Sequence, residues 1–266
     1  EVSIDLQQVS NDSYLKSYKQ KSPLINSNNI LTSSINFSGF NDDLSFNSEM
    51  TVYENLSKKN NDRYEHILPS YDLTKQINTN SNFKGNFELS SSGSIKGYNT
   101  NILEKININD LLYTSNPIIT NNGIENNFNL IIKNINTESE NSTVYKNNFN
   151  TSVGALAEFN SSYPLIKKTE KYQKIISPKI SLRYNPNNTK NKKKDLRPID
   201  YDNIFDLNRL SFSDTLEGGE SITFGSSYSV SNNLDKELFN ANIANVLRIK
   251  EDKNIPSSSS LGQKTS

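Results

Sequence analysis

The chain of 266 residues is predicted to be all-β, as part of an antiparallel transmembrane β-barrel. Stretches of alternating apolar and polar residues recur along it, no stretch is continuously apolar, and only 33% of the residues are hydrophobic. Alternation with a period of two places apolar side chains on one face of a strand and polar side chains on the other. Strands of roughly 9–11 residues are long enough to cross a bilayer.

The composition agrees with this fold class. A mean hydropathy of -0.70 suits a barrel wall, which needs only half of each strand to be apolar. The 13 tyrosines and 12 phenylalanines argue against a disordered polar chain, which would be poor in aromatic residues. A net charge of zero does not favour a nucleic-acid partner. Because cysteine is absent, the chain has no disulfide and no thiolate metal site.

Eight or nine stretches alternate, most clearly 30–39 and 221–230, and 128–135 is predicted as a strand although it has apolar residues on both faces. Asn41-Asp42-Asp43 predicts a tight hairpin turn, and Pro69 predicts a strand end or edge because proline cannot donate to a ladder. Residues 105–127 are ambiguous, and 185–220 is an irregular stretch that lies outside the barrel or folds inward. The predicted strands are 2–8, 30–39, 44–52, 67–73, 83–97, 128–135, 152–163, 176–184, 221–230 and 238–249.

The apolar faces of the alternating strands are expected to contact lipid and the opposite faces to line a hydrated lumen. A closed barrel satisfies its backbone hydrogen bonds internally, which permits strands to span the membrane. Serine, asparagine, threonine and lysine dominate the lumen face, and we expect about nine to twelve strands of a larger barrel. The residues expected to contact lipid are Leu31, Ile35, Phe37, Leu44, Phe46, Met50, Ile180, Leu182, Ile222, Phe224 and Tyr228.

No catalytic, cofactor or metal site emerges from the residue pattern, so the chain is not expected to be an enzyme. The single histidine, His66, has no nucleophile or ligand set at a recognisable spacing and is expected in a loop or at a strand end. The acidic cluster of Asp200, Asp202 and Asp206 lacks the glycine and the oxygen ligands of a calcium loop. The basic run 190–194 is expected to be a solvated loop.

Several segments, in one order along the chain, resemble the barrel domain of the outer-membrane LPS-assembly protein family, LptD. Residues 198–214 resemble the family's stretch of Asp, a Leu/Ile-Phe pair and an Arg-Phe-Ser-Gly-x-Asp run, with Leu210-Ser211-Phe212 here in place of Phe-Ser-Gly. Residues 176–184 resemble its x-x-Pro strand, and 163–165 resemble its Tyr-Pro-Leu segment. The residues that match these structural motifs are Tyr163, Pro164, Pro178, Asp200, Phe205, Arg209 and Asp214.

The resemblance implies a role in inserting lipopolysaccharide into the outer leaflet of the outer membrane of a Gram-negative bacterium. It implies as partners lipopolysaccharide, the lipid bilayer, a plug lipoprotein of the LptE type and a periplasmic bridge of the LptA type. Residues 1–266 are then part of a single outer-membrane barrel domain, whose N-terminal periplasmic domain and closing strands lie outside this sequence. The start in mid-strand without an initiator methionine agrees with a fragment.

Two other functions share the alternating pattern. A porin-like outer-membrane channel would have the same strands and the same lipid-facing residues. A secreted β-sandwich or adhesin module would instead bury the same apolar faces in a dry core and stay soluble without detergent.

Overall fold

The computed structural model describes residues 1–18, 27–77 and 84–263, and these form an all-β protein. Its helices are α1 (Tyr14–Tyr18) and two 3-10 turns, Asn60–Arg63 and Ser260–Gly262. No described helix is long and apolar enough to cross a membrane. The strands are β1 (Val2–Asp5), β2 (Ile30–Asn41), β3 (Leu44–Asn55), β4 (Tyr64–Ile77), β5 (Gly85–Tyr98), β6 (Ile102–Ser115), β7 (Ile118–Ile119), β8 (Glu125–Glu140), β9 (Asn150–Ser162), β10 (Leu165–Lys168), β11 (Tyr172–Asn185), β12 (Gly219–Asn232) and β13 (Glu237–Arg248).

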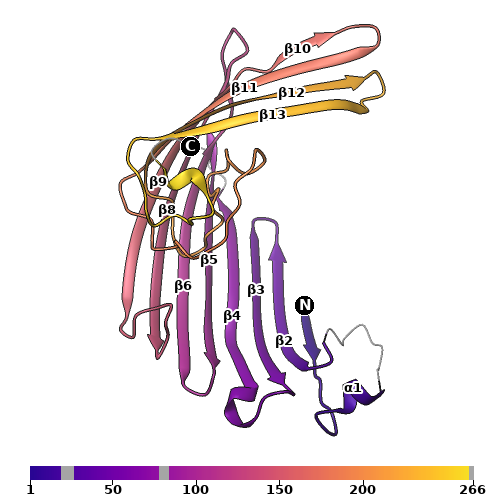
Figure 1. The fold of residues 1–266 in the computed structure, drawn as a ribbon, viewed down its shortest axis with the longest axis vertical. Coiled ribbons are helices and arrows are strands. Elements are labelled where there is room, and N and C mark those ends of the chain that lie inside the picture. Colours follow the sequence, from indigo (N-terminus) through magenta and orange to yellow (C-terminus); the bar gives the residue numbers. More distant parts are fainter. Residues whose placement is uncertain (19–26, 78–83, 264–266) are drawn as a thin grey trace. The chain divides into compact units, whose positions relative to one another are not determined.

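These strands form one antiparallel sheet in which the long strands follow one another in chain order (Figure 1). The order is β1-β2-β3-β4-β5-β6-β8-β9-β11-β12-β13, with the short β7 paired to β8 and the short β10 paired to β11. Among the described residues β1 and β13 end this path without pairing to each other, so the sheet is open. This confirms the predicted antiparallel, partial-barrel topology.

The structure confirms most predicted strands and resolves the ambiguous segment. Asn41 pairs with Leu44 across a turn of Asp42 and Asp43, as the predicted hairpin requires. Residues 105–127, ambiguous in sequence, contribute to β6, β7 and the start of β8. The predicted strand 83–97 appears as β5 from Gly85, and Phe83 lies outside the described residues.

Pro69 does not lie at a strand end or on an edge strand, contrary to the prediction. It lies inside β4, which is between β3 and β5 in the sheet. Glu49 pairs with Ser70 whereas Thr51 pairs with Ile67, so β4 has an extra residue opposite Met50. A bulge leaves a residue outside the regular ladder and therefore accommodates the missing N–H of proline.

The chain divides into two compact units. The first comprises Glu1–Ile77, Glu88–Asp110 and Asn134–Ser152, and the second comprises Asn78–Phe87, Leu111–Lys133 and Val153–Ser266. In the first unit, Leu15 of α1 and Leu56 pack against Leu31 and bury it to 4% exposure. Leu31 was expected to contact lipid, and this is wrong because the helix and the end of the hairpin cover it.

The other expected lipid contacts keep one exposed apolar face in each unit. In the first unit, Ile35, Phe37 and Met50 are 45%, 52% and 49% exposed. In the second unit, Ile180, Leu182, Ile222 and Phe224 are each about 40% exposed. The alternate residues of the same strands, such as Ser181 and Thr223, are buried. In the second unit the exposed side is thus the apolar one, and in the first unit the polar residues that alternate with Ile35 and Phe37 are half-buried.

Gly93 on β5 gives a test of packing in the first unit. A Cβ there would lie 2.7 Å from the Tyr71 ring and 2.9 Å from the Ile106 carbonyl oxygen, while a Cβ on Gly97 of the same strand meets no atom within 4 Å. We expect Gly93→Ala to lower the free energy of unfolding by about 1–3 kcal/mol because of overpacking. Gly97→Ala, measured by the same denaturant titration, should change it by less than about 0.5 kcal/mol. Equal effects of the two substitutions would contradict this packing.

Candidate functional site: a segment held on the polar face

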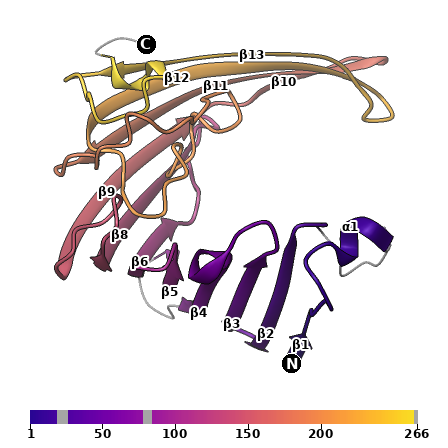
Figure 2. The ribbon, with the colours of Figure 1, turned by 60° about the horizontal axis from the view of Figure 1, so that its bottom comes forward.

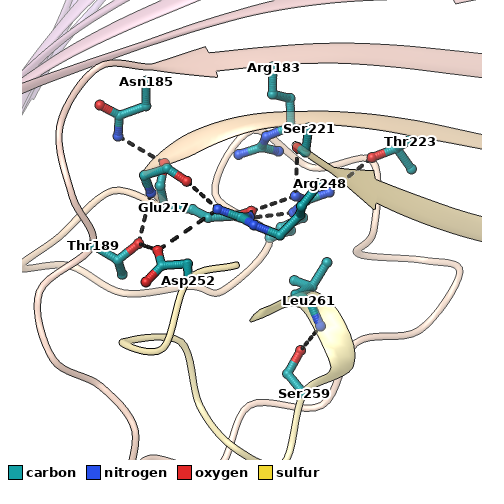
Figure 3. A network of polar contacts seen from close by, with 12 residues as sticks. Arg183, Asn185, Thr189, Glu217, Ser221, Thr223, Arg248, Asp252, Ser259 and Leu261 are labelled. Atoms are coloured by element: carbon teal, nitrogen blue, oxygen red, sulfur yellow. Dashed lines mark hydrogen bonds and ion pairs between the residues drawn. The ribbon is translucent and has the colours of Figure 1, made fainter. Parts of the chain in front are cut away.

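The second unit carries a buried polar network on the face opposite its exposed apolar side chains. Two segments meet there: 186–218, which joins β11 to β12, and 249–263, which follows β13 (Figures 1 and 2). Both lie against polar-face residues of β11, β12 and β13, and side chains from all of them converge in Figure 3. The irregular stretch 185–220 therefore folds onto the polar face of its own strands.

Arg209 and Glu217 form the centre of this network. Arg209 Nε donates to Glu217 Oε2 at 2.7 Å and Nη2 donates to Oε1 at 2.5 Å, which is the paired geometry that a planar guanidinium favours. Its remaining donors reach β12, with Thr223 Oγ1 at 2.9 Å and Ser221 Oγ at 3.0 Å. Arg209 is 2% exposed, so water replaces none of these partners. One side chain thus joins 186–218 to β12.

Arg248 joins the same carboxylate to the end of β13. Its guanidinium donates to Glu217 and to the Gly218 carbonyl oxygen, and its Nη2 lies 3.8 Å from an Asp252 carboxylate oxygen. Thr189 Oγ1 donates to Asp252 at 2.5 Å and accepts from the Gly218 N–H at 2.8 Å. The two segments are therefore linked to each other as well as to the sheet.

Close backbone approach requires glycine at position 218. A Cβ on Gly218 would lie 2.3 Å from the Asn187 carbonyl oxygen and 2.7 Å from the Thr189 nitrogen. The sequence signal Gly218-Gly219 marks a turn before a strand, and in the structure the first of the two glycines admits the crossing backbone of 187–189.

Arg183 of β11 forms a second connection. Its Nη1 donates to Glu158 Oε2 of β9 at 3.2 Å and to the Asp206 carbonyl oxygen at 2.6 Å, and its Nη2 donates to the Leu207 carbonyl oxygen at 2.5 Å. Both side chains of the ion pair are almost fully buried. Loop carbonyl oxygens 206 and 207 thereby obtain the donors that buried backbone groups need.

The charges determine the ionisation of Glu217, which lies just before β12. Burial alone would raise the pKa of this carboxyl group, but the positive charge and hydrogen bonds of Arg209, with the charges of Arg183 and Arg248, outweigh it and lower the pKa to about 2. Glu217 is therefore a carboxylate at every physiological pH.

An apolar cluster packs together the same two segments that carry the polar network. Leu210 and Phe212 of the loop pack with Val246 of β13 and with Ile255 and Leu261 of the final segment. Ile204 belongs to the same cluster, and Ile199 and Phe205 pack against it. The two segments thus form a small core on a face that is otherwise polar.

The structure brings four of the seven motif residues into this region. Arg209 is its centre, and Asp214 accepts from Lys192 Nζ at 2.9 Å. Asp200 Oδ1 accepts from the N–H groups of Asp202 and Asn203 and closes a local turn. Among the described residues no group of three or more acidic or histidine side chains could hold a metal ion, and this includes the Asp200 cluster.

Phe205, the fourth of these residues, has a cation next to its ring. Its ring and that of Tyr201 lie edge to face at 5.9 Å, and Lys179 Nζ of β11 lies 5.8 Å from the centre of the Phe205 ring. A lysine over an aromatic face is attracted by the negative potential of the ring. Phe205 therefore contacts β11 as well as the apolar cluster.

The basic run 190–194 is only partly the solvated loop that was expected. Lys192 is paired with Asp214, its side chain is 18% exposed, and its Nζ lies 5.2 Å from the centre of the Phe212 ring. Burial lowers the pKa of Lys190. Lys193 and Lys194 are exposed as predicted. His66, expected in a loop or at a strand end, lies near the start of β4 with its ring stacked on Tyr64 at 6.1 Å.

The departure from the family pattern at 210–212 still leaves a left-handed residue in the turn. Ser211 has a φ of 51° and its N–H bonds the Asn208 carbonyl oxygen at 2.8 Å. The left-handed conformation that a glycine would permit is thus taken by the serine one position earlier.

The other three motif residues meet on neighbouring strands. Ser162 pairs with Lys179 and Leu165 pairs with Ile176, so Tyr163 and Pro164 lie opposite Pro178 and Ser177 in one continuous register. The Tyr163 N–H donates to the Pro178 carbonyl oxygen at 3.0 Å, and Pro178 has no N–H with which to return the bond. The two prolines thus interrupt the ladder along β11, between the part that pairs with β9 and the part that pairs with β10.

A cavity of about 430 Å³ lies between these two motif groups. It is open, most of its lining residues are polar, and its charged side chains are Lys179 and Glu125. Its walls are Glu125, Asn127, Asn160, Ser161, Ser162, Pro164, Ser177, Lys179, Ile180 and Phe205. Hydroxyl and amide groups there can hydrogen-bond a hydrated, polar ligand.

Sequence reasoning missed Glu217, Arg248 and the Arg183–Glu158 pair. A signal existed, because Arg183 and Arg248 stand at polar positions of alternating strands, where a buried cation needs a carboxylate. Which carboxylate it would meet depends on contacts 25 to 31 residues away along the chain.

Comparison with known proteins supports the motif resemblance over the whole chain. A family model described as LptD, LPS transport system D, matches residues 1–266. No curated protein matches the chain closely enough to be counted as a relative.

Removing the charge of Glu217 tests the network. Glu217→Gln leaves Arg209 and Arg248 buried without their carboxylate, so we expect the free energy of unfolding to fall by about 3–5 kcal/mol. Glu220→Gln, three residues away and exposed, is the matched control and should change it by less than about 0.5 kcal/mol. Equal denaturation midpoints for Glu217→Gln and the unaltered protein would show that the network does not stabilise the fold.

Acid sensitivity follows from the lowered pKa of Glu217. In the unfolded chain this group protonates near its ordinary value of 4.5, whereas in the folded protein it stays ionised to about 2. Below pH 4.5 the unfolded state therefore binds more protons, so the contribution of Glu217, about 3 kcal/mol, is complete above pH 4.5 and is lost as the pH falls toward 2. Denaturation measured across this range should show a smaller loss for Glu217→Gln, and identical pH dependence of the two proteins would contradict the assignment.

Proposed function

We propose, because the chain belongs to the LptD family of LPS transport proteins, that it inserts lipopolysaccharide into the outer leaflet of the outer membrane. Its role in LPS transport follows from the family. We add to this role the outer-membrane location and the insertion into the outer leaflet. We also assign the apolar face of the sheet to acyl chains and the polar face to sugars.

The observation that carries the proposal is the inverted distribution of side chains in the second unit. Ile222 and Phe224 of β12 are exposed, while Thr223 between them is fully buried. Arg183, Arg209 and Arg248 are buried on the polar face as well. Water disfavours such an arrangement, whereas hydrocarbon outside and polar groups inside favour it.

The polar face would then be the wall of a hydrated lumen. Lipopolysaccharide has sugars that need water and acyl chains that need an apolar environment. Hydroxyl and amide groups such as those around the 430 Å³ cavity suit the sugars, and the exposed apolar face suits the acyl chains. The segments 186–218 and 249–263 would narrow this lumen at a fixed place, because buried ion pairs and a small apolar core hold them.

The seven motif residues are proposed to act structurally. Arg209, Asp214, Phe205 and Asp200 shape the inward-folded segment, and Tyr163, Pro164 and Pro178 interrupt the ladder beside the cavity. None of them needs to react with a substrate. The proposal therefore describes a transporter without a catalytic centre.

Residues 1–266 are proposed to be part of a single outer-membrane barrel domain. Further strands would pair with β1 and β13, whose outer edges have no partner strand among the described residues, since an open edge exposes unpaired backbone groups to hydrocarbon. A plug lipoprotein of the LptE type in the lumen and a periplasmic bridge of the LptA type are the partners that this arrangement would require.

A porin-like channel is the competing function within the membrane. Reconstitution of the complete natural protein with its plug partner in liposomes separates the two, because a transporter delivers lipopolysaccharide to the vesicle membrane and a porin does not. Ion conductance without delivery would overturn the proposal. A soluble sandwich is tested by stability without detergent, since it would bury Ile222 and Phe224 in a dry core.

Matched arginine substitutions test which face meets lipid. Phe224→Arg places a charge on the apolar face of β12, where we expect a cost of about 2–4 kcal/mol at membrane depth and a loss of barrel assembly and surface lipopolysaccharide. Ser227→Arg, on the opposite face of the same strand, should assemble normally. Assembly is measured from the amount of folded protein in outer-membrane fractions, and a defect limited to Ser227→Arg would reverse the proposed orientation.

A further inference from the structure

The exposed face of the first unit changes from apolar to polar between β4 and β9. Phe46 of β3 pairs with Leu73 of β4 and Ser48 pairs with Tyr71, so Tyr71 lies on the same face as Phe46 and Met50. The Tyr71 hydroxyl then contacts Ser91 Oγ at 3.1 Å and accepts from Asn107 Nδ2 at 2.6 Å. Polar side chains of β5, β6, β8 and β9 continue from this point.

These side chains form a lattice of hydrogen bonds that we call the amide patch. Its members are Tyr71, Ser91, Asn107, Asn109, Asn134, Asn136 and Thr151. Asn109 donates to Asn107 Oδ1 at 2.8 Å and to Asn134 Oδ1 at 3.2 Å, and Asn136 donates to the same two oxygens at 3.0 and 2.7 Å. Neutral groups on adjacent strands thus hold one another in place.

Two residues of the amide patch have hydrogen-bonding groups without a partner in the patch. Each amide has two N–H donors and an oxygen with two lone pairs. Asn109, Asn134 and Asn136 use both N–H groups within the described part of the chain, whereas Asn107 uses one, toward Tyr71. The Asn136 oxygen accepts one bond, from Thr151 at 2.7 Å, and keeps one lone pair. Asn107 and Asn136 therefore offer a free donor beside a free acceptor.

These two groups line a cavity of about 270 Å³. Tyr71, Ile95 and Phe149 give it apolar and aromatic walls, and Phe149 is 67% exposed at its rim. Lys105 and Glu138 also line the cavity, and they form an ion pair with Nζ and Oε2 at 3.1 Å. The volume is near the lower end of small-ligand pockets, which begin at roughly 300 Å³.

We propose that this cavity, at the edge of the amide patch, binds a sugar of a membrane glycolipid from outside the barrel wall. Neighbouring hydroxyl groups of a sugar ring each donate and accept, as the free donor on Asn107 and the free acceptor on Asn136 require. The C–H face of the ring packs on an aromatic wall such as Phe149. The lipid anchor of the glycolipid lies along the apolar side chains of the same face, among them Phe46 and Met50.

Other ligand classes fit the cavity less well. An acyl chain would leave the free N–H of Asn107 unpaired, at a cost of about 1–3 kcal/mol. A free anion would meet one cation, Lys105, already paired with Glu138. The inference rests on the proposed function, because the sugar reaches this cavity only if the apolar face meets the membrane.

Site-specific crosslinking in outer membranes tests the proposal. A benzoylphenylalanine at Ile95, inside the cavity, should yield a photoadduct with lipopolysaccharide, while one at Phe37, on the same face but outside the cavity, should yield mainly phospholipid adducts. Asn107→Leu with Asn136→Leu should reduce the lipopolysaccharide adduct at Ile95 by about tenfold. Asn47→Leu, which removes a bond from Asn36 elsewhere in the first unit, should leave it unchanged.

A second pair of variants lies at exposed positions, where a substitution is not expected to impair folding. Phe149→Ala at the cavity rim should reduce the adduct severalfold, and Val144→Ala, 64% exposed in the same loop but outside the cavity, should not. An adduct that survives Phe149→Ala and the paired asparagine substitutions would overturn the inference. So would a phospholipid adduct at Ile95, or an adduct abolished by equimolar free polysaccharide, which would indicate a soluble sugar.

Liposome delivery and the Ile95 adduct together distinguish failure of the sugar site from failure of the proposed function. If liposome delivery of lipopolysaccharide succeeds while the Ile95 adduct is absent, only the sugar site is wrong. If delivery itself fails, the transport proposal is wrong as well.

Discussion

The buried carboxylate of Glu217 is the interaction on which the second unit depends. Arg209 from the loop and Arg248 from β13 both donate to it, and Ser221 and Thr223 of β12 take further donors of Arg209. A buried cation without a partner is very costly, so the loop 186–218, β12 and β13 are stable in this arrangement only together. The position of 186–218 on the polar face is therefore a consequence of charge pairing, with the Leu210 and Phe212 cluster adding apolar contact.

The protein also reverses the usual distribution of side chains, in which apolar groups are covered and polar groups are exposed. Each strand separates its apolar from its polar residues by a period of two, and the environment then decides which face is covered. In the second unit the covered face is polar, and in the first unit the exposed face is apolar except at the amide patch. The amide patch satisfies nearly all its own donors, which is the condition for polar groups beside hydrocarbon.

Prolines interrupt the regular ladder at two places without ending the sheet. Pro69 occupies a bulge in β4, and Pro164 with Pro178 interrupts the pairing along β11, at the point where its partner changes from β9 to β10, while the register continues. In both places the backbone is released from pairing on one side. Next to the second break lies the cavity lined by Lys179 and Phe205, so the interruption coincides with an opening of the polar face.

The sequence by itself determined most of the strands, the antiparallel fold class, the hairpin at Asp42-Asp43 and the two chemical faces, because alternation and turn residues are local signals. It left 105–127, which contains most of β6, ambiguous. The motif residues also indicated the family and the importance of 198–214. Only the tertiary structure decided that Leu31 is covered, that Pro69 lies in a bulge, and that Glu217 pairs with Arg209 and Arg248. These outcomes depend on contacts between residues distant in the chain, and a pattern with a period of two carries no information about which distant side chains meet.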